Sequence, residues 1–207
     1  MEGLPQKDKK KYWLLIGITE EKLGIPIKSS MEIVEIARYK GTVPICFDKI
    51  AFHADAIIPI NRVKIHTDWR GEVESGLLKM LVIGFDKHNG ATEIHSLGMD
   101  NFHKVIPEVG SIIINKAPVI FGVACIEDAY DQTAEIRVLL PKKFYTQERE
   151  MLKRTKKYMA KINIPQIGVL VIDEIGKDIS GDGVDPNIIG RFRGKQKNDV
   201  KGPNENK

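Results

Sequence analysis

The chain has 207 residues, of which 42% are hydrophobic and 29% are charged, and its formal net charge at pH 7 is +4. These values are ordinary for a globular protein and allow one large domain or two small ones. Aromatic residues are 7% of the chain and many lysines lie near its two ends, which favours solvated tails over a nucleic-acid-binding surface. No apolar run reaches ~18 residues, so we expect neither a membrane span nor a signal peptide.

The two cysteines indicate the compartment. Cys46 and Cys125 lie far apart, each within an apolar segment. Buried free thiols are therefore a better interpretation than a disulfide, and they fit a reducing cytoplasm.

The first third of the chain predicts a short helix, a hairpin and a buried strand. Thr19 has the side chain of an N-cap for a helix over residues 18–23. Residues 32–38 alternate as a strand does, and residues 43–47 follow a Lys-Gly turn as a second strand, so the pair predicts a hairpin. Residues 56–61 are an apolar run that predicts a buried strand.

The rest of the chain predicts alternating helices and strands. Apolar periodicity predicts helices over residues 74–83 and 102–113, and Thr146 is expected to cap a third helix that ends near residue 162. Buried or partly buried strands are expected at residues 119–126, 134–140 and 168–173.

This order predicts an α/β fold with a mostly parallel sheet and helices on both faces. The domain is expected to cover residues 18–193. A polar, irregular segment over residues 1–17 would precede it, and a disordered tail over residues 194–207 would follow.

A polar loop that contains His66 follows the strand predicted at residues 56–61, where open α/β sheets bind ligands. A histidine in such a loop can act as a general acid or base. The alternative is a loop histidine that only bonds a backbone carbonyl. A second loop of this kind, rich in glycine and aspartate, covers residues 173–187.

Two further residues are candidates for the same site. Lys79 lies off the apolar face of its predicted helix, where an amine can form a covalent bond to a carbonyl or thioacyl carbon, although most such lysines are simply solvated. His95 can ligate a metal, because neutral imidazole suits nickel, copper, zinc and iron. No zinc motif surrounds it, and the chain has no dinucleotide fingerprint, phosphate-binding loop or nucleophile elbow.

Several motifs in order resemble one known family. Residues 61–71 (NRVKIHTDWRG), 74–81 (ESGLLKML), 119–133 and 173–181 (DEIGKDISG) are similar to segments of the nickel-pincer-dependent lactate racemase superfamily. The resemblance covers roughly residues 18–193 and is closest to a lactate racemase-like branch of unassigned substrate.

The resemblance implies a cofactor and roles for three residues. The cofactor is a nickel pincer nucleotide, a pyridinium mononucleotide whose two sulfur arms hold nickel. Lys79 resembles the lysine that binds it covalently, His95 resembles the nickel ligand, and His66 resembles an acid/base histidine. The implied function is racemisation or epimerisation of a small 2-hydroxy acid.

Two other interpretations remain open. One is a non-catalytic truncated or split fragment that needs a partner chain, because the family's upstream Gly-Ser-His-Gly-Gly-like segment has no counterpart before Trp13, and Gly190 stands where lactate racemase has glutamine. The other is a generic nucleotide-binding α/β module. An incomplete cleft would leave apolar surface bare, so we also expect a homo-oligomer or a complementary chain.

Overall fold

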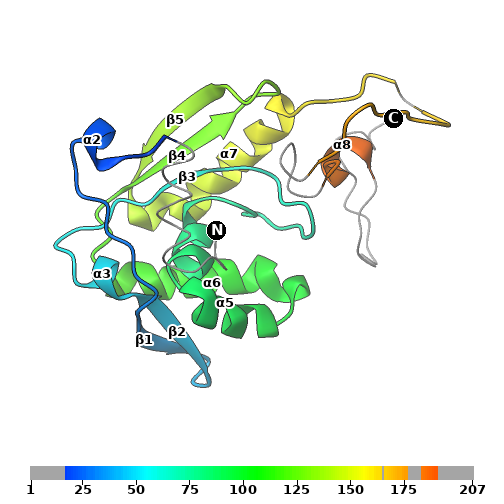
Figure 1. Cartoon of the computed structure of the whole chain (residues 1–207). Helices are drawn as coiled ribbons and strands as arrows, with labels where there is room; N and C mark the ends of the chain where they lie inside the picture. Colours follow the sequence, from blue (N-terminus) through cyan, green and yellow to red (C-terminus); the bar gives the residue numbers. More distant parts are fainter. Residues whose placement is uncertain (1–16, 165, 177–182, 191–207) are drawn as a thin grey trace.

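The protein is described by a computed structural model that covers residues 17–164, 166–176 and 183–190. Its centre is a three-stranded sheet of β3 (Ile60–Arg62), β4 (Gly122–Glu127) and β5 (Thr133–Leu139), in the order β3-β4-β5 (Figure 1). A separate two-stranded sheet joins β1 (Ile33–Tyr39) to β2 (Val43–Asp48). The chain is therefore a mixed α/β protein.

The prediction of a mostly parallel sheet is wrong for the described residues. β3 and β4 are parallel, but β5 is antiparallel to β4. A tight turn causes this reversal: the Asp128 carboxylate accepts hydrogen bonds from the backbone N–H groups of Tyr130 and Gln132. A parallel neighbour would require a crossover of a dozen residues or more, which this turn does not provide.

Helices cover one face of the sheet in the described part of the chain, not both as predicted. α4 (Leu77–Lys79) and α7 (Phe144–Tyr158) lie against β4, since a Cβ added at Gly122 would meet the side chains of Leu77 and Phe144. Ala124 and Ile126 on the same face are completely buried. The opposite face stays exposed.

A long helix with a buried apolar face, α6 (Phe102–Lys116), lies beside α5 (Lys87–Ser96) below the sheet in Figure 1. The amphipathic helix predicted at residues 102–113 is confirmed, and Pro107 is accommodated within it. The side chains of its apolar face are buried; they are Phe102, Val105, Ile106, Val109 and Ile113.

Local signals near the start of the described chain are confirmed. α2 (Glu20–Leu23) begins after Thr19, whose side chain accepts the backbone N–H of Lys22. β1 and β2 form the predicted antiparallel hairpin, and α3 (Lys49–Phe52) follows it directly.

Other predicted elements differ. The helix expected at residues 74–83 is α4 followed by a π-helical turn over Met80–Gly84. α7 begins before Thr146, whose hydroxyl donates to the Lys143 carbonyl, so the predicted cap is wrong. Residues 168–173 form no strand, and Val169 and Val171 are each 83% exposed.

Two expectations about the chain ends fall mostly outside the described residues, namely the irregular segment over 1–17 and the disordered tail over 194–207. Within the described residues, every helix is too short or too polar to cross a lipid bilayer.

Candidate functional site

His66 lies in the loop that leaves β3, and its ring orientation is set by the backbone. The N–H of Asp68 donates to Nδ1 of His66 over 3.0 Å. Because Nδ1 accepts this bond, a neutral imidazole carries its proton on Nε2. The candidate acid/base group therefore presents an N–H donor to its surroundings.

A buried carboxylate holds this loop in place. Glu74 is 2% exposed and accepts the N–H of His66 at 2.8 Å and that of Gly71 at 3.3 Å. Burial raises the pKa of Glu74, while these two bonds and the nearby Arg70 guanidinium act in the opposite direction. The backbone on both sides of Trp69 is thus tied to one side chain.

The loop is also tied to the C-terminal part of the chain. Asn187, in the short helix α8 (Pro186–Ile189), donates to the His66 carbonyl and accepts from the Arg70 guanidinium. Arg70 donates to the same carbonyl. Segments more than 100 residues apart therefore meet at the backbone of His66.

An aromatic row connects His66 with His95. The His66 ring is centred 5.5 Å from Trp69, Trp69 is 5.7 Å from Phe102, and Phe102 is 5.1 Å from His95. Trp69 and Phe102 are buried, whereas His95 is exposed in the last turn of α5. Within the described residues, the buried indole N–H of Trp69 has no hydrogen-bond acceptor.

Lys79 is half-buried at the end of α4, and the start of that helix is anchored from α7. The Glu148 carboxylate, 1% exposed, accepts the backbone N–H groups of Leu77 and Leu78. Burial raises the pKa of Glu148 to about 7. One face of α4 also touches α6, since a Cβ at Gly110 would overlap the Leu78 side chain.

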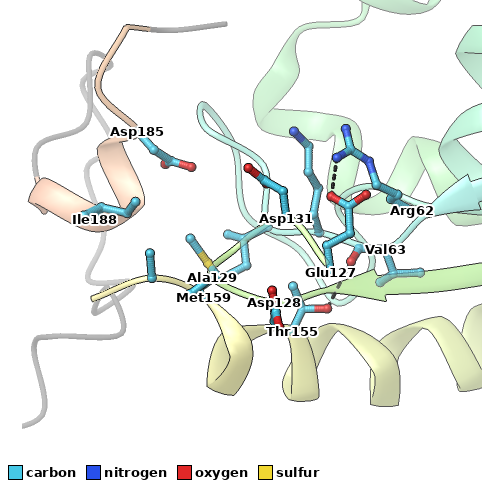
Figure 2. A pocket seen from close by; sticks show the side chains of 13 residues that line it. Arg62, Val63, Glu127, Asp128, Ala129, Asp131, Thr155, Met159, Asp185 and Ile188 are labelled. Carbon is cyan, nitrogen blue, oxygen red and sulfur yellow. Dashed lines mark hydrogen bonds and ion pairs between the residues drawn. The ribbon is translucent and has the colours of Figure 1, made fainter. Parts of the chain in front are cut away.

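A cavity of about 420 Å³ opens at the carboxyl ends of β3 and β4 (Figure 2). Arg62 and Glu127 form an ion pair at one side, and Asp131 and Asp185 approach from the loop after β4 and from the start of α8. This is the ligand side of an α/β sheet, as the sequence predicts for the His66 loop.

The three predicted site residues are placed as follows. His66 immediately follows Ile65, which lines the cavity, but His66, Lys79 and His95 are all outside its lining. His66 and His95 lie on the same aromatic row. Lys79 belongs to α4, which contacts α6 at Gly110. Gly110 lies eight residues after Phe102, which is about 12 Å along the axis of α6.

Sequence reasoning missed the groups that position these residues. Glu148 is 71 residues from the N–H group of Leu77 that it accepts, and Asn187 is 121 residues from the carbonyl it bonds. A local signal existed only for Glu74, because the Glu-Ser-Gly segment at residues 74–76 puts an acidic residue and a glycine just before a helix.

The metal expectation rests on His95 alone. In the part of the chain that the structure describes, no group of three or more His, Cys, Asp or Glu side chains could hold a metal ion. A cofactor that brings its own donor atoms and needs one imidazole still fits this donor set.

No protein-family model matches this chain, and no curated protein is significantly similar to it.

Proposed function

We propose that this chain is a nickel-pincer-nucleotide-dependent isomerase that racemises or epimerises a small 2-hydroxy acid. The observation that carries the proposal is the aromatic row. The buried rings of Trp69 and Phe102 lie between His66, the candidate proton-transfer histidine, and His95, the candidate nickel ligand. The resemblance of the segments around His66 and Lys79 to the lactate racemase superfamily supports the roles of these two residues.

The residues present fit the cofactor. Lys79 offers a half-buried amine for covalent attachment, and His95 offers an exposed imidazole for nickel. The buried indole N–H of Trp69, which has no acceptor among the described residues, would be satisfied by a carboxylate or phosphate oxygen. A bound cofactor of this class would supply a hydride acceptor for the reaction.

The residues of this chain would supply binding and proton transfer. As a neutral imidazole, His66 can donate a hydrogen bond from its Nε2–H to a substrate oxygen. To transfer a proton it must first be protonated on Nδ1 as well, which breaks the bond from the Asp68 N–H. To take a proton from a hydroxyl group instead, Nε2 must be bare, so the bond from the Asp68 N–H to Nδ1 has to open. The backbone of the His66 loop is held by Glu74, Arg70 and Asn187 while the His66 ring gains or loses a proton.

A second candidate function is a fragment that needs a partner chain to complete its site. The exposed apolar face of the sheet favours it, because such a face in a stable protein is normally covered. In either case we place the protein in the reducing cytoplasm, which the free thiols of Cys46 and Cys125 support. Both thiols are half-buried rather than buried.

The test is intact-mass spectrometry of the protein made together with the cofactor-synthesis enzymes and nickel. We expect a covalent mass increase that maps to Lys79 after proteolysis. Lys79→Arg, which keeps the charge, should remove the increase. His95→Ala should keep the adduct and lose the nickel, as measured by elemental analysis.

An unmodified Lys79 in the parent protein would contradict the enzyme proposal. An adduct without racemase or epimerase activity on a panel of 2-hydroxy acids would instead favour the fragment interpretation.

A further inference from the structure

The side chains of β5 alternate in the reverse of the pattern expected for a strand at a solvated sheet edge, with charged residues facing the helices and apolar residues facing away. Glu135 and Arg137 point toward the helices, where Arg154 of α7 pairs with Glu135. Ile136 and Val138 point away from the helices and are 65% and 67% exposed. A sheet with one solvated face normally places polar side chains there, so this face is built for contact.

The same pattern extends over the whole sheet. Ile60 of β3 is paired with Val123, and Val123 with Val138, which makes one apolar row across three strands. Cys125 and Ile136 make the next row. We define the open face by the strand side chains that share this side, together with the exposed side chains just before β3 and just after β5. The strand residues are Ile60, Val123, Cys125, Ile136 and Val138, and the flanking residues are Ile58 and Leu140.

One end of the open face carries a pair of opposite charges. Arg62 lies beside Cys125 in the register, and it forms an ion pair with Glu127. Figure 2 shows this pair at the cavity. A face with an apolar centre and one cation next to one anion is self-complementary about a two-fold axis that passes between the two charges, because that axis sets each charge against its opposite in the second copy.

We propose that the open face packs against the open face of a second copy of this chain, which forms a two-fold dimer. A fully exposed aliphatic side chain offers roughly 100 Å² of apolar surface. This value is the free energy gained by burying such a side chain divided by the free energy per unit of buried area. Five residues of the face are about half to two-thirds exposed, so the apolar centre amounts to about 300 Å² per copy.

This area determines the strength of the dimer. A standard interface buries about 800 Å² per partner, of which somewhat more than half is apolar. The open face with its charged end is smaller than that class and belongs with weak, transient interfaces. The dimer is therefore one that forms and dissociates with concentration, with the two sheets about 10 Å apart.

The first measurement is the molar mass of the full chain by light scattering after size exclusion, over a hundredfold range of concentration. We expect a shift from monomer toward dimer as concentration rises. Val138→Lys should abolish the shift, because it places an ammonium group in the middle of the apolar rows. Gln132→Lys adds the same charge in the exposed turn before β5 and should leave the shift unchanged.

The second measurement locates the contact. Cys125 lies in the central strand of the open face, so two copies bring their thiols close to the axis. In a Cys46→Ser background, a short bis-maleimide should cross-link two chains, and Cys125→Ser should prevent it. This readout does not depend on any lysine variant folding correctly.

A parent chain that stays monomeric at every concentration would overturn the proposal and would mean that this chain or another molecule covers the face. A dimer that survives Val138→Lys and yields no Cys125 cross-link would also overturn it. Neither result bears on the cofactor at Lys79.

Discussion

Asp86 is a buried carboxyl group just before α5. It is 1% exposed, and neither carboxyl oxygen has a hydrogen-bond partner there. Burial raises the pKa of Asp86 to about 7, and the nearby Cys46 backbone N–H, whose geometry falls short of a regular hydrogen bond, offsets only part of this. The neighbouring Lys87 pairs with Asp48.

We predict that Asp86 makes the protein less stable as the pH rises. Its folded-state pKa lies above the unfolded value of 3.8, so the folded state retains a proton that the unfolded state has lost between about pH 4 and pH 7. The free energy of unfolding should fall across this window, by at most ~1.4 kcal/mol per pH unit from this group. Glu148 contributes with the same sign.

Urea unfolding of Asp86→Asn at several pH values tests this. The variant should be more stable than the parent above pH 7 and should show a shallower pH dependence. Asp55→Asn, at an exposed aspartate, is the matched control and should follow the parent. Equal slopes for Asp86→Asn and the parent would show that Asp86 is ionised at low pH in the folded protein.

At the residue scale, the sequence predicted positions better than environments. It placed His66 correctly in a loop after a strand, because an apolar run that ends in a polar segment is a local signal. The burial of Asp86, Glu74 and Glu148 could not be predicted, since their surroundings come from other parts of the chain. A carboxylate in a helical sequence is normally exposed.

At the scale of elements, the start of α4 depends on a close contact between Gly76 and Glu148. Gly76 has φ = +157° and ψ = −154°, a conformation open mainly to glycine. A Cβ there would lie 2.8 Å from the carboxyl carbon of Glu148 and still closer to one oxygen. The carboxylate cannot retreat without losing the N–H groups of Leu77 and Leu78.

We therefore predict that Gly76→Ala destabilises the protein by about 3 kcal/mol, from backbone strain together with lost hydrogen bonds to a buried carboxylate. Chemical unfolding measures the loss. Gly41→Ala is the control, because Gly41 also has positive φ but nothing lies within 4 Å of an added Cβ. It should cost only about 1–2 kcal/mol. Similar losses in the two variants would rule out the contact with Glu148 as the cause.

Helices and strands were predicted correctly where a short-range sequence pattern determines them. The predictions failed where the structure depends on which strands pair with each other. The β1–β2 hairpin and α6 follow from short-range alternation and helical periodicity. Residues 168–173 have the composition of a buried strand, but a strand needs a neighbour, and in the described residues they have none. The strand predicted at residues 134–140 is β5, but its antiparallel direction was missed, because the turn at Asp128 was not recognised as a hairpin turn.

At the scale of the whole molecule, Asn187 connects the C-terminal segment to the body. Its side chain is 2% exposed; it bonds the His66 carbonyl and Arg70 and also donates to Asp185. α8 is four residues long and cannot be stable alone. The Asn187 amide therefore helps to hold residues 185–189 beside the cavity.

We predict that Asn187→Ala releases α8 without unfolding the rest. Removing the amide costs about 1–3 kcal/mol locally, more than a four-residue helix can supply by itself. Hydrogen exchange followed by mass spectrometry should show faster exchange in residues 183–190 and near His66, with unchanged protection of β4 and α6. Asn115→Ala is the control, since the Asn115 side chain only bonds a carbonyl within α6. Unchanged exchange at residues 183–190 would mean that contacts other than the Asn187 amide hold the segment against the loop, and the cavity would then keep its shape in the variant.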